Sequence, residues 1–82
     1  MANERLGFVG IVMENRVHAA EVNTLISEYA GLIRARVGVP DSEHDAAVIG
    51  LIVHGDDISL GKLTAKLGNV PGVQVKSALT KK

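Results

Sequence analysis

Two stretches of the sequence are apolar at consecutive positions, and they constrain the fold more than any other feature. Residues 46–54 read AAVIGLIVH and residues 6–13 read LGFVGIVM, and both are rich in Val and Ile. A strand with one buried face alternates apolar and polar residues, whereas a strand covered on both faces is apolar throughout. We therefore predict that both stretches are central strands of one sheet.

The composition limits what can be packed around these strands. Hydrophobic residues make up 46% of the chain, but Phe8 and Tyr29 are its only aromatic residues. An aliphatic core suits a thin sandwich of sheet and helices, and it disfavours a large enclosed ligand cavity, which usually has aromatic walls. With 82 residues, the chain is expected to form a single domain over residues 1–82.

The charge and the missing cysteines exclude several functions. Nine basic and nine acidic residues give a net charge of zero, so we expect no direct nucleic-acid partner. The chain has no Cys, which excludes disulfides and thiolate ligands, and we expect no resident cofactor. No apolar run approaches the ~18 residues needed to span a membrane. The expected location is the cytoplasm, without a membrane partner.

Helical spacing of apolar residues follows each central strand. The first predicted helix covers residues 16–30 with Asn15 as its N-cap, and the second begins after Asp56 or Asp57. The apolar positions are Val22, Leu25, Ile26 and Tyr29 in the first helix, and Leu60, Leu63 and Leu67 in the second.

Two further segments alternate apolar and polar residues, as edge strands do. Residues 32–39 place Ile33, Ala35 and Val37 on one face and Arg34 and Arg36 on the other. Residues 73–80 carry Lys76 in the same manner. Charged side chains of this kind are typical of edge strands, because they discourage pairing with another chain.

The resulting element order, β-α-β-β-α-β, predicts the topology. Right-handed crossovers place both helices on the same face of the sheet. The compact solution is an α+β, ferredoxin-like βαββαβ sandwich with an antiparallel sheet in the order 4-1-3-2. This order puts the two apolar strands in the centre and the charged strands at the edges.

One face of that sheet is left without helices, although both faces of the central strands are apolar. Roughly four to six aliphatic side chains would be exposed there. Their combined apolar area would exceed the few hundred Å² that a soluble monomer normally exposes in one patch. We therefore predict a homo-oligomer, a dimer or a tetramer, built sheet-to-sheet or edge-to-edge. The candidate interface residues are Val9, Ile11, Ile49 and Leu51 on the central strands, and Arg34 and Arg36 on an edge strand.

The turn before the first helix is the candidate ligand site. Glu14, Asn15 and Arg16 precede a helix whose free N–H groups favour an anion. The alternative is that Asn15 only caps the helix and Arg16 is solvated.

The three histidines give no metal motif. His44 and His54 would lie about 30 Å apart along one strand and cannot share a metal. His18 and His44 fall at the same end of the sheet as several carboxylates, so these two histidines are the candidate metal ligands. Solvated surface histidines are the favoured interpretation, so no metal site is assigned. No nucleophile is paired with a base, and we do not expect an enzyme.

Three segments resemble a known family over essentially the whole chain: GFVGIVMENR, RVGVP, and AAVIGLIVHGDDISLGKLTAKLGNVPGVQVKSALTKK. The chain is similar to a short family described as proposed regulators of the iron-only hydrogenase system. The resemblance implies an ACT-like ferredoxin sandwich, similar to the effector-binding domain of the nickel-responsive repressor. It also implies a homo-oligomeric regulatory module that binds a small effector at a subunit interface near Glu14, Asn15 and Arg16.

Two properties of the nickel-responsive repressor are not expected here. The repressor has a separate ribbon-helix-helix domain for DNA, whereas four residues precede the first predicted strand of this chain. Its nickel site includes a Cys, which this chain lacks. The alternative function is a protein-interaction subunit that docks on a hydrogenase or maturation protein without a small ligand.

Overall fold

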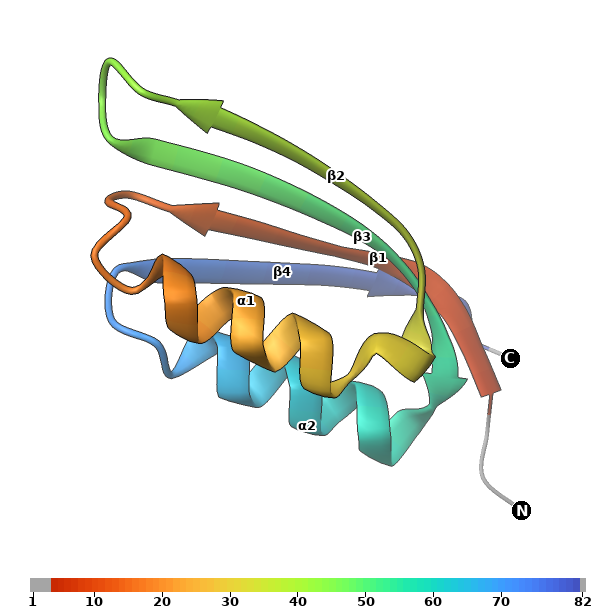
Figure 1. The fold of residues 1–82 in the computed structure, drawn as a ribbon. Coiled ribbons are helices and arrows are strands. Elements are labelled where there is room, and N and C mark those ends of the chain that lie inside the picture. Colours follow the sequence, from red (N-terminus) through yellow and green to blue (C-terminus); the bar gives the residue numbers. More distant parts are fainter. Residues whose placement is uncertain (1–3, 82) are drawn as a thin grey trace.

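The computed structural model describes residues 4–81 and confirms the predicted ferredoxin-like sandwich. The elements are β1 (Glu4–Met13), α1 (Ala19–Glu28), a short 3-10 helix η1 (Ala30–Leu32), β2 (Ile33–Asp41), β3 (Ala46–Asp56), α2 (Asp57–Gly68) and β4 (Val73–Leu79). The strands form one antiparallel sheet in the order β2-β3-β1-β4, which is the predicted order read from the opposite edge. Both helices cover the same face (Figure 1).

The central pair, β1 and β3, is in register along its whole length, from Glu4 opposite Asp56 to Met13 opposite Ala47. Alternate side chains point beneath the helices, as the period of two in a strand requires. The residues predicted for the oligomer interface are among them, and all are 0–4% exposed: Val9, Ile11, Ile49 and Leu51. Their assignment to the interface is therefore wrong, because they form the core. Their sequence neighbours lie on the face of the sheet that the helices leave uncovered.

Asp56, one of the two predicted N-caps, caps helix α2. The Asp56 side chain accepts hydrogen bonds from the Ser59 backbone N–H at 2.7 Å and from the Ser59 hydroxyl at 2.9 Å. These bonds favour the carboxylate and lower the pKa of Asp56. The cap fixes the helix so that its leucines face the sheet, where Leu60, Leu63 and Leu67 are at most 1% exposed.

Helix α1 is shorter than predicted, and Asn15 is not its cap. The helix begins at Ala19, and the N-cap position is His18, which makes no side-chain capping bond. Asn15 instead accepts a hydrogen bond from the Val17 N–H at 3.1 Å. Asn often stabilises a turn in this way, two residues before the donor. The predicted helix start was therefore three residues too early.

Strand β2 contains an irregularity that the alternating sequence did not predict. Ile33 lies opposite Val53, whereas Ala35 lies opposite Ile52, so the register shifts at Arg34. A bulge of this kind reverses which side chains face each side of the sheet. Ile33 consequently packs against the core, while Val37 and Val39 point to the face of the sheet that the helices leave uncovered. The prediction that Ile33 and Val37 share a face is wrong.

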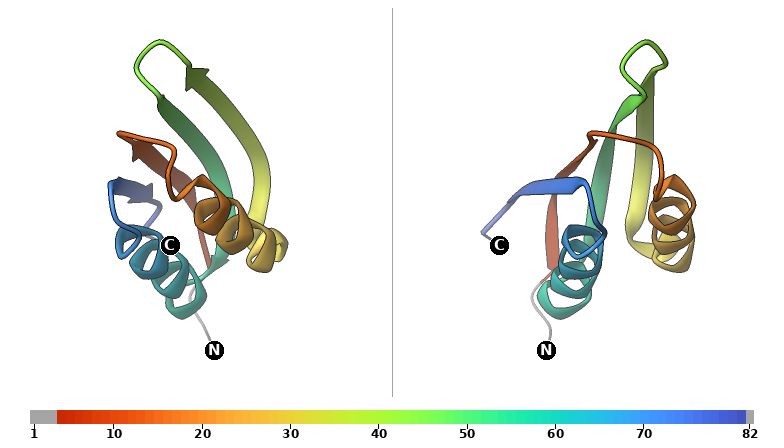
Figure 2. Two further views of the ribbon diagram at one scale, coloured as in Figure 1. Left: turned by 60° about the vertical axis from the view of Figure 1, so that its left-hand side comes forward. Right: turned by 90° about the vertical axis from the view of Figure 1, so that its left-hand side faces the viewer.

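The β2–β3 hairpin extends beyond the ends of the helices, as both views in Figure 2 show. The described chain is correspondingly elongated, with principal extents of 45 × 18 × 17 Å. Among the helices described within residues 4–81, none has both the length and the hydropathy needed to cross a bilayer. The hairpin gives the sheet an overhang beside α1, and the hollow of the candidate site lies there.

Candidate functional site

A cleft of about 630 Å³ lies between α1 and the β2–β3 hairpin. This volume falls within the range of small-molecule sites. The residues that line it are Met13, Arg16, Ala19, Asn23, Arg36, Gly38, Val39, Pro40, Asp45, Ala47 and Ile49. The cleft therefore combines apolar walls with four polar side chains: two arginines, one amide and one carboxylate.

Arg36 reaches the cleft because of the bulge in β2. It lies opposite Leu51, on the side of the sheet that the helices cover. Its guanidinium Nη2 donates a hydrogen bond to Asn23 Oδ1 on α1, with the two atoms 2.7 Å apart. Asn23 is neutral, and no carboxylate of the described chain forms an ion pair with Arg36. The bond orients the guanidinium and leaves its positive charge uncompensated.

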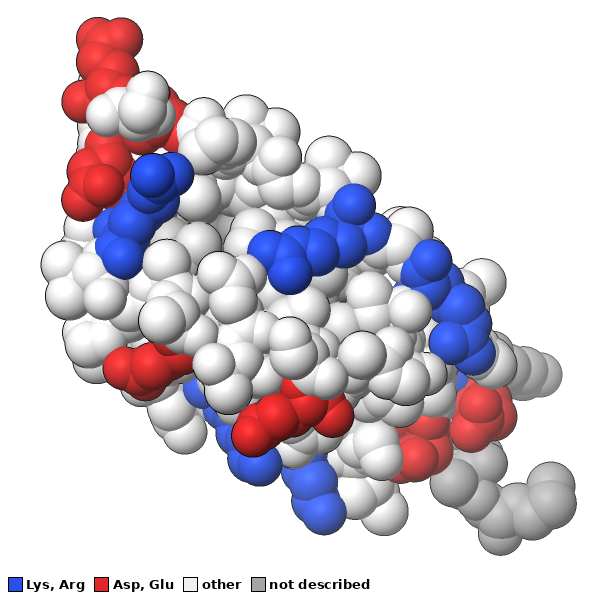
Figure 3. Space-filling model, viewed as in Figure 1, with Lys and Arg blue, Asp and Glu red and all other residues white. Residues whose placement is uncertain are grey.

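Arg16 contributes the second positive charge. Its Nε lies 3.8 Å from Asp45 Oδ1, and both side chains are substantially exposed. An exposed ion pair at this distance contributes little stability, so Arg16 can exchange it for a ligand. Asp45 is held at the hairpin turn with a φ of 55°. Figure 3 shows acidic side chains over the tip of this hairpin, with separate basic groups across the same face of the molecule.

Glu14 and Asn15, the other two residues of the predicted ligand site, do not line the cleft. The Glu14 N–H donates to the Gly72 carbonyl at 3.1 Å, which ties the β1–α1 turn to the α2–β4 turn. Gly72 has a φ of +76°, and a Cβ there would lie 3.2 Å from Asn15 Nδ2. The structure thus gives Glu14 and Asn15 contacts within the fold and places only Arg16 in the cleft.

His18 and His44 each pair with a carboxylate three residues away in the chain, and not with each other. His18 Nδ1 lies 2.8 Å from Glu21 Oε1, and His44 Nδ1 lies 2.7 Å from Asp41 Oδ2. Within residues 4–81, no group of three or more His, Asp or Glu side chains could hold a metal ion. The structure does not bring His18 and His44 into one such group.

His54 and Arg34 meet at the opposite end of the sheet. Arg34 Nη2 lies 3.2 Å from His54 Nδ1, and Arg34 also donates to the Gly31 carbonyl. The two arginines predicted together therefore separate, since Arg36 lines the cleft and Arg34 does not.

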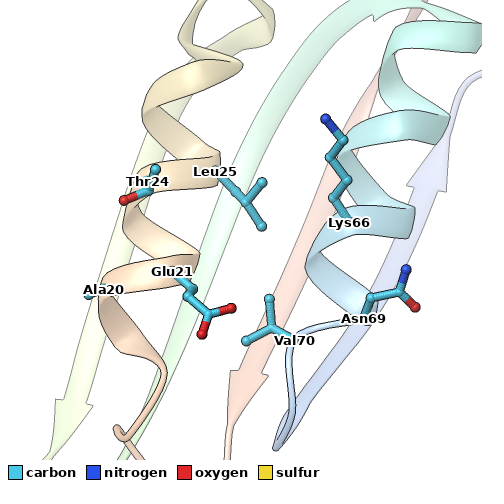
Figure 4. A pocket seen from close by; sticks show the side chains of 7 residues that line it. All are labelled: Ala20, Glu21, Thr24, Leu25, Lys66, Asn69 and Val70. Atoms are coloured by element: carbon cyan, nitrogen blue, oxygen red, sulfur yellow. The ribbon is translucent and has the colours of Figure 1, made fainter.

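A second hollow, of about 490 Å³, lies between α1 and α2 (Figure 4). Leu25 and Val70 form its apolar floor, with Glu21 on one side and Lys66 on the other. The Lys66 ammonium lies 5.3 Å from the Tyr29 ring centroid, and its interaction with the Tyr29 hydroxyl raises the pKa of Lys66. One cation and one carboxylate line this groove, so it has no excess of positive charge.

Sequence reasoning missed Asn23, and it considered Asp45 only as one of the carboxylates near His18 and His44, not as a residue of a ligand cleft. Asn23 directly follows the buried Val22 on α1, so it flanks the apolar stripe and lies near the sheet. A short polar side chain in that position was the available signal. Arg36 was identified, but as an interface residue, because the alternating pattern gave no sign of the bulge.

The comparisons with known proteins connect this arrangement to a family. A family model described as "TM1266-like: Iron-only hydrogenase system regulator, putative" matches residues 5–77. The chain belongs to this family. A solved member, the uncharacterized protein TM1266 from Thermotoga maritima, is 36% identical with a TM-score of 0.88, covering 96% of this chain and all of that one. No curated protein matches the chain.

More distant solved structures share the fold of this TM1266-like chain. The ACT domain from GTP pyrophosphokinase of Chlorobium tepidum has a TM-score of 0.67 at 21% identity, covering 96% of this chain and 89% of that one. The PII-like protein CPII from Thiomonas intermedia K12, solved with ADP, AMP and bicarbonate, has a TM-score of 0.53 at 15% identity, covering 98% and 96%. The architecture is therefore the ACT-like one that the sequence predicted.

Proposed function

We propose that this chain is a cytoplasmic regulatory module of the iron-only hydrogenase system, acts as a homo-oligomer, and binds a small anionic effector between α1 and the β2–β3 hairpin. The observation that carries the proposal is the position of Arg16 and Arg36 in one cleft of about 630 Å³. The guanidinium group of Arg is well suited to a phosphate or a carboxylate, because it can donate two parallel hydrogen bonds to two oxygens of the anion.

The chemistry of the cleft favours an effector with several anionic oxygens and an apolar part. Arg36 is oriented by Asn23 and keeps its charge, so it can bind two oxygens of one anion. Arg16 would give up its exposed contact with Asp45 and close on the ligand from the β1–α1 turn. The apolar walls, which include Met13, Pro40 and Ile49, would bury the uncharged portion.

Two findings support the regulatory context and guide the choice of probe. The family's description names a regulator of the iron-only hydrogenase system. The PII-like structure with the shared fold was solved with ADP, AMP and bicarbonate, which are all anions. We use ADP, inorganic pyrophosphate and bicarbonate as probes, and we assign a regulatory role rather than catalysis.

A second candidate function is a protein-interaction subunit that docks on a hydrogenase or maturation protein without a small ligand. It is favoured by the exposed apolar residues of the sheet face that the helices do not cover. The two functions differ in one respect that can be measured. Only an effector-binding module is stabilised by a small anion through Arg36.

Thermal unfolding tests the proposal. An anion present at 100 times its dissociation constant stabilises the folded state by about 2.7 kcal/mol and raises the midpoint. We expect this shift with at least one of the three probes, and we expect Arg36→Gln to abolish it. Arg34→Gln is the matched control, since Arg34 lies on the same strand but outside the cleft. The absence of any shift, or an equal shift in Arg36→Gln, would reject effector binding and favour the interaction subunit.

A further inference from the structure

The sheet face opposite the helices is an apolar surface. Seven large apolar side chains on its three adjacent strands β2, β3 and β1 are 39–67% exposed: Leu6, Phe8, Val12, Val37, Val39, Val48 and Ile52. The register places them in continuous rows across the sheet. Val39, Val48 and Val12 are successive partners in one row, and Ala35, Ile52 and Phe8 are successive partners in another. These side chains therefore form one patch, which we call the open face.

The bulge at Arg34 enlarges this face. Without the register shift, Val37 and Val39 would point toward the helices and the arginines would point to the open face. With it, Val37 lies opposite Gly50 and Val39 lies opposite Val48, both on the open side. The two valines are 67% and 61% exposed. A strand irregularity that exposes two valines is costly unless another surface covers them.

We propose that the open face is the interface of a homodimer, in which the sheets of two copies pack face to face. The inference deepens the homo-oligomeric part of the proposed function by naming its surface and its partner, and it does not require an anion in the cleft. Two sheets packed in this way lie about 10 Å apart, with interdigitated side chains.

The area of the open face fits this partner. A fully exposed side chain of this size presents ~150–200 Å², so seven side chains at these exposures present roughly 600 Å². This value is at the upper end for the largest apolar patch of a monomer. Two such faces would bury ~1,200 Å², which is within the range of specific, stable interfaces.

The charges of the open face also fit a second copy. Its centre is uncharged, and the charged groups lie at the margins: Lys76 on β4, Asp41 at the end of β2, and Arg34, His54 and Glu4 at the far end of the sheet. An apolar centre with a polar rim is the usual anatomy of an interface. Because the rim contains both signs and the chain has zero net charge, two identical copies do not repel each other.

The interface also adjoins the cleft, through the β2–β3 hairpin. Val39 belongs to the open face and also lines the cleft, and its neighbours Gly38 and Pro40 line the cleft as well. A partner packed on the hairpin would therefore restrain one wall of the cleft. By thermodynamic linkage, an anion that binds more tightly to the restrained cleft would also tighten the dimer.

Light scattering of the full chain at micromolar concentration tests the proposal. We expect a wild-type mass of two or four copies, and we expect Val37→Asp and Val48→Asp each to halve it. Burying a charge from each copy in a two-fold interface should raise the dissociation constant at least about 100-fold. Val17→Asp and Ile58→Asp are matched controls, because both residues are more exposed, at 76% and 70%, but lie off the open face. Circular dichroism establishes that each variant is folded.

Each other outcome counts against the interface. A monomeric wild-type protein overturns the proposal, and so does an oligomer whose mass is unchanged in both folded open-face variants. A control variant that dissociates as readily as Val37→Asp also overturns it. Titration of the same samples with ADP separates the two proposals, since a monomer that binds ADP through Arg36 would retain the effector site without the interface.

Discussion

The aromatic ring of Phe8 lies against the backbone of Gly50. A Cβ on Gly50 would be 3.0 Å from Phe8 Cε1, and a Cβ on Gly10 would be 2.9 Å from Phe8 Cε2. Gly10 and Gly50 lie opposite each other in the register of β1 and β3. The ring therefore covers a paired stretch of backbone that has no side chains of its own, which accounts for two glycines in the interior of central strands.

This contact predicts an energetic coupling between positions 8 and 50. In the Phe8→Ala background, Gly50→Ala should stabilise the protein by about 0.5–1 kcal/mol, since alanine loses less backbone entropy than glycine. With Phe8 present, the same change should give no gain, because the new methyl group displaces the ring. Urea unfolding at one protein concentration should show a coupling of about 0.5–2 kcal/mol, whereas additive effects would mean that the ring does not depend on the glycines.

Gly7 and Gly61 should respond in opposite ways to the same substitution. A Cβ on Gly7 would overlap the carbonyl oxygen of Ala78 on β4, which is backbone and cannot rotate away, so Gly7→Ala should destabilise by about 1–3 kcal/mol. Gly61 lies in α2 with open space around its Cα, so Gly61→Ala should stabilise by about 0.5–1 kcal/mol. Denaturant midpoints measure both, and a tolerated Gly7→Ala would contradict the close approach of β1 and β4.

The cap of α2 predicts a loss of stability in acid. The folded-state pKa of Asp56 lies below its ordinary value, so its contribution is fully present above roughly pH 4 and is lost as the pH falls through the folded pKa. Asp56→Asn keeps a good capping side chain without a titrating group. We expect its melting temperature to lie below wild type at neutral pH, because Asn has one acceptor oxygen for the two hydrogen bonds from Ser59, and to fall less steeply below pH ~4. Glu43→Gln is the control, and an equal flattening there would remove the assignment to Asp56.

Much of the fold follows from the pattern of the sequence. The continuous apolar runs identified β1 and β3 as the central strands, and the helical spacing of leucines identified α2. The choice of face within β1 and β3 did not follow. When every position is apolar, either set of alternate residues can face the core, and the packing of the helices selects Val9 over Phe8.

Less of the candidate site was predictable, because it depends on one irregular residue. An alternating strand of Ile33, Arg34, Ala35 and Arg36 gives no signal of a register shift. The bulge at Arg34 nevertheless sends Arg36 to Asn23 and leaves Arg34 beside His54. Arg16 was identified from its place before a helix, but its approach to Asp45 depends on how far the β2–β3 hairpin extends.

The most direct test of anion binding in the cleft is an NMR titration of the ¹⁵N-labelled protein with ADP. The account predicts that the largest shifts fall on the Arg36 side-chain Nε–H and on the amides of Asn23, Arg36 and Asp45, and that Arg36→Gln loses them. Saturation without such shifts, or largest shifts at Glu21 and Lys66 in the groove between the helices, would contradict it.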